Sequence, residues 1–447
     1  MKMPAAAVAA AVLAAGGLFL AAVPPWNLPD EPTHLDRVRR LAGTPVSQAA
    51  VIRSMAGYGF WRNLGLETPC PLPSRFEEIE FLRLAGAADQ TEKRPAAYYL
   101  AAAALLRTAG AASPVADLYL LRGFSLLLTS LTGALLCLAA RRLAPGEPWF
   151  GLGAAAAGVL LPQALLIGVS ASYEPLLDAA AAAFLLAAVR MQFAGPTFLS
   201  VAALTLTAAA AAAVSPKGLF LLPAAPLAGI LAGAGVEGPG RRLRGLAGGA
   251  GTLLAAAAVA LALTWFRPEA AAKLLAAVRE AWEKLRETCG GGVYPAWRYY
   301  PWFNREVFRS FFFKAGWAAA LLPAWTYAVF AGACLLALAG QVPLLIRLAA
   351  RRRESRGACL RAWAVLAAVA AFSVLGFYLS RGLGPRAAPQ GRHLLVGAGA
   401  GGILFAWGLT AWARRRWRTA IAVGVFLAFF LSDLAIAAFF LFPLYGS

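Results

Sequence analysis

Long apolar runs recur along the whole chain, and they constrain the fold more than any other feature of the sequence. Each run is about 20 residues long, which is enough for an α-helix to cross the hydrocarbon core of a bilayer. Alanine and leucine dominate the runs, whereas a membrane-spanning strand needs alternating polar and apolar residues. Hydrophobic residues make up 60% of the 447 residues and charged residues only 14%. The sequence therefore predicts an all-α integral membrane protein.

Basic residues gather in short gaps between the apolar runs, where the positive-inside rule places cytoplasmic loops. We therefore assign the formal net charge of +20 to membrane topology and expect no nucleic-acid partner. With these gaps inside, the chain is expected to cross the membrane about eleven times, starting inside and ending outside. The predicted spans are 5–23, 115–140, 149–168, 175–192, 197–214, 218–236, 246–265, 317–346, 361–380, 393–412 and 419–441.

The first span also resembles a signal peptide, because a lysine precedes it and its end is rich in small residues. Its apolar part is long, however, and Pro24-Pro25 come next without a clear cleavage site. We expect residues 5–23 to remain as a membrane helix.

Two longer polar segments, 24–114 and 266–316, are expected to be outer loops of a single transmembrane domain that comprises residues 1–447. Both are expected to carry helices that lie along the membrane surface. In the first segment, a helix is predicted to start near Asp30 and to end at Gly43. The short apolar stretch 95–109 is predicted to be interfacial or re-entrant.

Each of these outer segments carries one cysteine, Cys70 in the first and Cys289 in the second. The outer side of a cell membrane permits disulfides. A bond between these two cysteines would join the loops, provided that the fold brings them close enough.

Ionisable and amide side chains collect at the predicted outer ends of the spans, and both histidines of the chain are among them. A charged group at the bilayer centre costs about 2.5–3.5 kcal/mol, so such groups mark candidate functional sites. Residues 29–36, PDEPTHLD, place two adjacent acids and a histidine just after the first span. The candidate catalytic residues are Asp30 and Glu31, and the candidate substrate-binding residues are His34, Arg122, Glu174, Asp178, Lys217, Gln390, Arg392 and His393.

Several of these residues also have a purely structural interpretation. Asp30 and Glu31 can cap a helix and compensate its dipole, and Arg122 can snorkel towards the interface. His34 can orient Asp30 across one helical turn, bind a metal or lie at the interface. Asp433, deeper in the last span, is either the partner of a buried cation or a helix-packing group.

Carboxylates and cations on one membrane face suit sugar transfer from a lipid-linked donor. Arginine and lysine can neutralise the phosphate of such a donor as it leaves. A carboxylate can take the proton from an acceptor hydroxyl, a general-base contribution of about 10²–10⁴-fold. The lipid tail needs a groove between helices, so the acids are expected just past a span.

Six short segments follow one another along nearly the whole chain. They are Pro29 to His34, Pro95 with Tyr98-Tyr99, Pro162-Gln163 to Ser172, Ser215 to Gly218, Phe312 to Trp317 and Gln390 to His393. In this order they resemble a bacterial polytopic membrane family of mostly unassigned function, related to the GT-C-fold glycosyltransferases that use polyprenyl-phosphate sugars.

The resemblance implies a GT-C-like fold and an inverting glycosyltransferase in the bacterial inner membrane, with its site facing the periplasm. It implies a polyprenyl-phosphate-linked sugar as donor, a cell-envelope glycan or lipid as acceptor, and Asp30 as the base. Glu31 would bind substrate or metal beside it, and Arg392 and Lys217 would contact phosphate or sugar. No cofactor is required, although the acid pair would also suit a divalent metal.

The chain departs from the family pattern at two places. A tyrosine usually stands where this chain has His393, and an Asn-x-Asp usually follows the position of Ser172, where Glu174 and Asp178 are the nearest acids. The main alternative function is a transporter or flippase for lipid-linked sugars, which also needs a lipid groove and phosphate-binding cations. A non-catalytic assembly subunit is a third.

Overall fold

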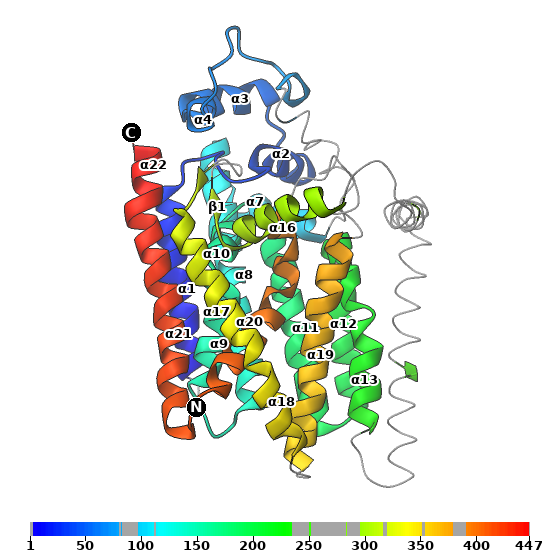
Figure 1. Cartoon of the computed structure of the whole chain (residues 1–447). Coiled ribbons are helices and arrows are strands. Elements are labelled where there is room, and N and C mark those ends of the chain that lie inside the picture. The colour runs from blue at the N-terminus through cyan, green and yellow to red at the C-terminus, as the bar shows by residue number, and fades with distance from the viewer. Residues whose placement is uncertain are drawn as a thin grey trace.

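The computed structural model describes residues 3–79, 82, 97–110, 113–234, 250–251, 283, 296–315, 320–350, 354–378 and 390–446. These residues form a bundle of helices that run roughly parallel to one another (Figure 1). Shorter helices, among them α2 (Glu31–Ala42), α7 (Ala97–Ala109) and α16 (Ala296–Phe312), lie across one end, which we name the cap end. The N-terminus lies at the opposite end, and the last helix, α22 (Phe442–Gly446), lies at the cap end (Figure 1).

Eight helical stretches of the described residues are long and apolar enough to cross a membrane. A ninth is a pair of helices, α9 (Phe150–Val159) and α10 (Pro162–Gly168), that meet at an angle of 67°. The eight are α1 (Met3–Ala22), α8 (Pro114–Leu143), α11 (Glu174–Ala194), η2 with α13 (Pro216–Leu221, Ala224–Ala234), α17 with α18 (Ala324–Ala339, Gln341–Ala349), the main part of α19 (Glu354–Phe377), η4 with α20 (Gly391–Gly397, Ala398–Ala411), and α21 with η5 and α22 (Arg415–Ile436, Ala437–Leu441, Phe442–Gly446).

These stretches confirm a multi-pass helical membrane protein, and each coincides with a predicted span. The predicted span 197–214 appears as α12 (Phe198–Val214), which is shorter than the others. The predicted span 246–265 lies outside the described residues apart from 250 and 251, as does most of the predicted loop 266–316. The count of eleven therefore remains a prediction.

The break between α9 and α10 has a local cause. Pro162 stands at the first turn of α10, and Leu161 before it is extended, with φ −63° and ψ 122°. A proline cannot donate its backbone nitrogen to a helix and restrains the residue before it to extended conformations. The predicted span 149–168 is therefore bent into two helices.

Basic residues of the described chain meet at the end opposite the cap. Arg418 Nη1 lies 3.0 Å from Glu147 Oε1, and Arg361 Nη2 donates to the carbonyl of Gln192 at 3.0 Å. Arg347 donates to the carbonyl of Ala411. These contacts gather the gaps after α8, α11, α18 and α20 at one end of the bundle, as the charge pattern predicts.

The cap is built from the predicted outer segment 24–114. Its described helices are α2 (Glu31–Ala42), α3 (Gln48–Gly57), α4 (Phe60–Asn63), η1 (Phe76–Glu78) and α7 (Ala97–Ala109), and α16 (Ala296–Phe312) lies beside them. Gly43 ends α2 with φ 80°, the left-handed conformation that glycine tolerates. Trp26 Nε1 donates to Ser54 Oγ at 3.0 Å and ties the cap to the end of α1. The helix predicted from Asp30 to Gly43 is confirmed.

Small residues allow the spans to approach one another closely. A Cβ at Gly408 of α20 would overlap the carbonyl oxygen of Ala337 in α17, and one at Gly340 would overlap the carbonyl oxygen of Gly408. Close backbone contact of this kind is typical of membrane helices, which gain packing from it. A short two-stranded ribbon precedes α17 in the chain. It consists of β1 (Lys314–Ala315), paired antiparallel with β2 (Ala320–Leu321).

Candidate functional site

Glu31 and Arg122 form a fully buried ion pair at the cap end. Arg122 Nε donates to Glu31 Oε1 at 2.7 Å and Nη2 to Oε2 at 2.8 Å, and both side chains are 0% exposed. The backbone N–H groups of Leu28 and Ala171 also lie 3.4 Å from the carboxylate. A paired arrangement of this kind uses both carboxylate oxygens and fixes their direction.

Arg122 also donates to the carbonyls of Val23 at 2.7 Å and Pro24 at 2.9 Å. It therefore joins α8 to the end of α1 and to the first turn of α2. The interpretation of Arg122 as a snorkelling side chain is wrong, because the guanidinium is buried among protein acceptors. The pair instead holds rigidly the turn that carries Asp30.

Asp30 is the accessible acid of the predicted pair. Its side chain is 20% exposed, and its Oδ2 lies 3.3 Å from Nη2 of Arg392, which is 16% exposed. Gln390 Oε1 accepts from Arg392 Nε at 2.9 Å and orients the guanidinium. Three of the predicted residues, from two distant parts of the chain, thus meet in one polar group.

The backbone of Asp30 is in the left-handed region, with φ 62°. Its side chain makes no capping hydrogen bond to α2, whereas its carbonyl accepts from Thr33 Oγ1 and from the N–H of His34. The capping interpretation of this carboxylate is therefore wrong. Non-glycine residues in this region cost about 1–3 kcal/mol and concentrate at functional sites.

Behind Asp30, His34 is buried in an aromatic cluster. Its Nδ1 lies 2.8 Å from the hydroxyl of Tyr99, and its ring packs edge-on against Tyr173. The guanidinium of Arg37 lies 4.0 Å from the ring centre of Tyr99, a cation–π contact. His34 therefore supports the wall of the site, and Tyr173 connects it to the next pair.

Lys217 and Glu174 form this second pair, with Lys217 Nζ 3.3 Å from Glu174 Oε1. Lys217 also lies 5.5 Å from the ring centre of Tyr173. The lysine is 16% exposed and the glutamate 8%. Of the two acids that follow Ser172, Glu174 is thus the one that joins the cap-end polar groups.

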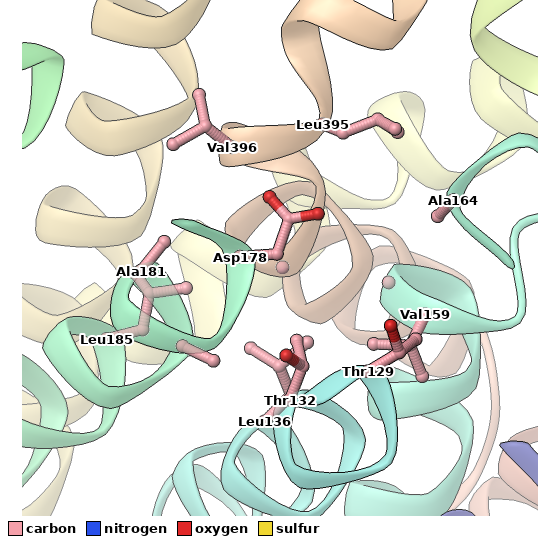
Figure 2. Close-up of a pocket in the computed structure, with 13 residues that line it drawn as sticks. Thr129, Thr132, Leu136, Val159, Ala164, Asp178, Ala181, Leu185, Leu395 and Val396 are labelled. Atoms are coloured by element: carbon pink, nitrogen blue, oxygen red, sulfur yellow. The ribbon is translucent and has the colours of Figure 1, made fainter. Parts of the chain in front are cut away.

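Asp178 lies one helical turn further along α11 and points elsewhere. Figure 2 shows its carboxylate in a small internal cavity with Thr129 and Thr132 of α8 opposite it. The cavity holds about 20 Å³, room for about one water molecule. Asp178 is therefore separate from Asp30 and faces the middle of the bundle.

The η4 segment carries Arg392 and packs directly on α16. The N–H of Gly391 donates to Ser310 Oγ at 2.6 Å. A Cβ at Gly391 would overlap the carbonyl oxygen of Val307 and the nitrogen of Phe311. The close approach of two backbones, which only glycine allows here, fixes the position of Arg392.

Replacing Gly391 with alanine is expected to lower the free energy of unfolding by about 1–3 kcal/mol, because the added methyl group forces η4 away from α16. Unfolding in mixed detergent micelles measures the loss. Gly401→Ala is the matched control, since a Cβ there meets no atom within 4 Å. Equal effects of the two substitutions would contradict the explanation.

A cluster of charges on α16 and β1 was missed at the sequence level. Glu306 is surrounded by Arg309 at 3.3 Å, Lys314 at 3.5 Å and Arg305 at 3.6 Å. The available signal was the segment from Phe312 to Trp317, which contains Lys314. The backbone N–H of Lys314 donates to Gln163 Oε1 at 2.6 Å, so this segment meets the Pro162-Gln163 segment.

The six segments that carry the family resemblance therefore come together at the cap end. Glu31 contacts Ala171, His34 contacts Tyr99, Asp30 contacts Arg392, and Lys217 and Gln163 make the contacts given above. The six segments are far apart from one another in the sequence. Their convergence defines a candidate site made of scaffold pairs and one accessible Asp–Arg pair.

The remaining predicted residues have mixed positions. His393 is buried against the ring of Phe377. Asp433 is fully buried in α21, and neither of its oxygens has a hydrogen-bond partner in the described chain, so the cation partner considered for it is not found there. Cys70 is exposed, and Cys289 lies outside the described residues, so their disulfide remains a prediction.

The described part of the chain offers few side chains that could together bind a divalent metal. No three His, Cys, Asp or Glu side chains gather there in a way that would hold an ion. The two acids of the predicted pair also point to different arginines.

Fold and site together define a multi-pass helical membrane protein with a polar site at one end of its bundle. A family model described as "Predicted membrane protein (DUF2142)" matches residues 13–398, and the chain belongs to this family. Searches of the curated proteins and of the solved structures gave no match.

Proposed function

We propose that this protein is a membrane glycosyltransferase with a GT-C-like fold that moves a sugar from a polyprenyl-phosphate donor to a cell-envelope glycan or lipid. The observation that carries the proposal is the accessible Asp30–Arg392 pair, placed where six distant segments converge. A base beside a phosphate-binding cation is what such a transfer needs. The scaffold of Glu31 and Arg122 holds the base in place.

In the proposed reaction, Asp30 takes the proton of an acceptor hydroxyl. The acceptor oxygen attacks the anomeric carbon, and the bond from that carbon to the phosphate oxygen breaks, with inversion. The bonding electrons leave with the phosphate, which Arg392 neutralises. A phosphate that draws Arg392 from its 3.3 Å contact also frees the Asp30 carboxylate to accept from the acceptor hydroxyl.

The other polar groups support this reaction in our proposal. Glu174 and Lys217 bind the sugar hydroxyls, and His34 holds the wall of the site through Tyr99. No step uses a metal or a cofactor. The cap end faces the periplasm of a bacterial inner membrane, because the basic clusters lie at the other end.

A flippase for lipid-linked sugars is the second candidate, and two features favour it. Transporters often contain broken spans and charged groups near the middle of the membrane. The 67° bend between α9 and α10 and the fully buried carboxylate of Asp433, well inside the stretch Arg415–Gly446, are features of this kind.

Purified protein in vesicles distinguishes the two functions. The assay supplies a radiolabelled polyprenyl-phosphate sugar with envelope acceptors, and measures both the sugar transferred and the donor moved across the bilayer. Transfer that is lost in Asp30→Asn and retained in Asp36→Asn supports the glycosyltransferase. Donor movement without any transferred sugar supports the flippase and overturns the glycosyltransferase.

A further inference from the structure

A long apolar groove runs between α17 and α21 with α20 as its floor, and its volume is about 740 Å³. Aromatic rings line it in series. The ring centres of Phe312 and Phe330 lie 4.4 Å apart, and Phe330 and Phe429 follow at 6.3 Å. Such a groove is large enough for a ligand, and its mainly apolar lining suits a hydrocarbon chain.

The groove runs through nearly the full thickness expected of a membrane. Along α21 and η5 its lining extends from Ile421 to Phe440. At about 1.5 Å per helical residue this interval covers about 28 Å, close to the ~30 Å hydrocarbon core. The acyl chains of a phospholipid cross only one leaflet, about half of that distance. The length of the groove therefore matches a lipid whose single chain is longer than a leaflet.

The cap-end rim of the groove carries the charge cluster on α16 and β1. Phe312 and Leu322 line the groove, and Lys314 lies two residues from Phe312 and pairs with Leu321 in the ribbon. Arg309 lies 5.9 Å from the ring centre of Tyr327, whose hydroxyl donates to the carbonyl of Phe313. The basic groups thus lie next to the residues that line the cap end of the groove.

The cluster has an excess of positive charge. Among the described residues, Arg305, Arg309 and Lys314 share the carboxylate of Glu306, so these four side chains carry two more positive charges than negative ones. Arg309 is 28% exposed and Lys314 18%, so a ligand can reach both. A phosphate monoester carries about −1.5 to −2 charges at neutral pH. A sugar-loaded phosphodiester carries only one.

The charge cluster and the Asp30–Arg392 pair lie on different sides of α16. Val307 and Ser310 face Gly391 and its neighbour Arg392. At 3.6 residues per turn, Arg309 and Phe312 point away from that face. A phosphate at the cluster is therefore separated from the accessible base by the helix.

We propose that the groove is a binding site for the spent carrier, polyprenyl phosphate, with its chain between α17 and α21 and its phosphate on Arg309 and Lys314. The assignment rests on the proposed function for the origin of this lipid, because transfer converts the phosphodiester donor into the monoester. It places a product site beside the reaction site. A reaction that reuses or reloads the carrier must then consume the lipid bound here.

Binding of polyprenyl phosphate to the detergent-solubilised full chain, measured with a photoreactive tail, tests the site without sugar transfer. We expect labelling of the α17 and α21 segments. Affinity should fall at least tenfold in the double variant Arg309→Gln with Lys314→Gln. Gly424→Trp should also weaken binding, because Gly424 lines the groove with open space around it, whereas Gly332→Trp on the exposed surface of α17 should not.

Competing lipids decide the identity of the occupant. Sugar-loaded polyprenyl phosphodiester and a diacyl phosphatidylglycerol are expected to compete at least tenfold less well than polyprenyl phosphate. Equal competition by either lipid overturns the proposal, and so do binding unaffected by Gly424→Trp and labelling confined to segments that do not line the groove. Asp30→Asn should bind normally. Groove binding without any transfer by the unsubstituted protein would refute the glycosyltransferase but retain the groove site.

Discussion

Replacing Asp30 with asparagine is expected to lower the rate of sugar transfer by about 10²–10⁴-fold, the usual contribution of a general base. Asparagine has nearly the same size and keeps an acceptor oxygen for Arg392, so the donor should still bind within about threefold of normal. The loss should appear in kcat, because the proton is removed only as the acceptor attacks. Single-turnover transfer and donor binding, measured separately, give the two quantities.

Asp36→Asn is the matched control for this experiment. Asp36 stands on α2, the helix that Asp30 precedes, and pairs with Arg40 at 3.1 Å, but Arg40 is 48% exposed and the pair lies at i, i+4. This variant should transfer sugar at close to the normal rate. If Asp30→Asn kept full activity, or if both variants lost it equally, Asp30 would not be the base.

Replacing Arg122 with methionine is expected to destabilise the protein by about 3–5 kcal/mol, a large part of the roughly 5–15 kcal/mol by which an ordinary protein is stable. The substitution leaves the fully buried carboxylate of Glu31 without its cation. It also leaves the carbonyls of Val23 and Pro24 without their donor. Unfolding in mixed detergent micelles, or the yield of folded protein, measures the effect.

A double-mutant cycle separates the pair from its surroundings. Removing both charges, as Glu31→Leu with Arg122→Met, should cost less than the sum of the single losses, because no buried charge remains unpaired. Arg40→Met is the surface control and should cost less than about 1 kcal/mol. Additive losses, or a loss from Arg122→Met no larger than that of Arg40→Met, would show that the pair does not hold the cap.

Much of the architecture followed from local chemistry. Apolar length alone located α1, α8 and α11, and the glycine after a basic turn ended α2 at the predicted place. The side chain of Asp30 did not follow its local signal. An aspartate before a helix usually caps it, but Arg392, 362 positions away, binds this one at 3.3 Å. No local rule contains that partner.

Local sequence rules also could not assign the different roles of the acidic residues. Asp30 and Glu31 are adjacent and look equivalent in the sequence, yet one is accessible and the other is fully buried. Glu174 and Asp178 lie four residues apart on one helix, yet Glu174 forms the 3.3 Å ion pair with Lys217 and Asp178 lines a separate cavity. The charge cluster of Glu306 was missed because Lys314 comes from a ribbon that folds back beside α16.

The sequence by itself determined that this is a helical membrane protein and which end of each span carries its basic residues, because the cost of burying backbone and charge in hydrocarbon acts on every segment separately. Only the tertiary structure decided which acid stays accessible, what Arg122 binds, and where a groove opens between α17 and α21. Those properties depend on contacts between helices that are distant in the chain, and such contacts are set by packing of the whole bundle.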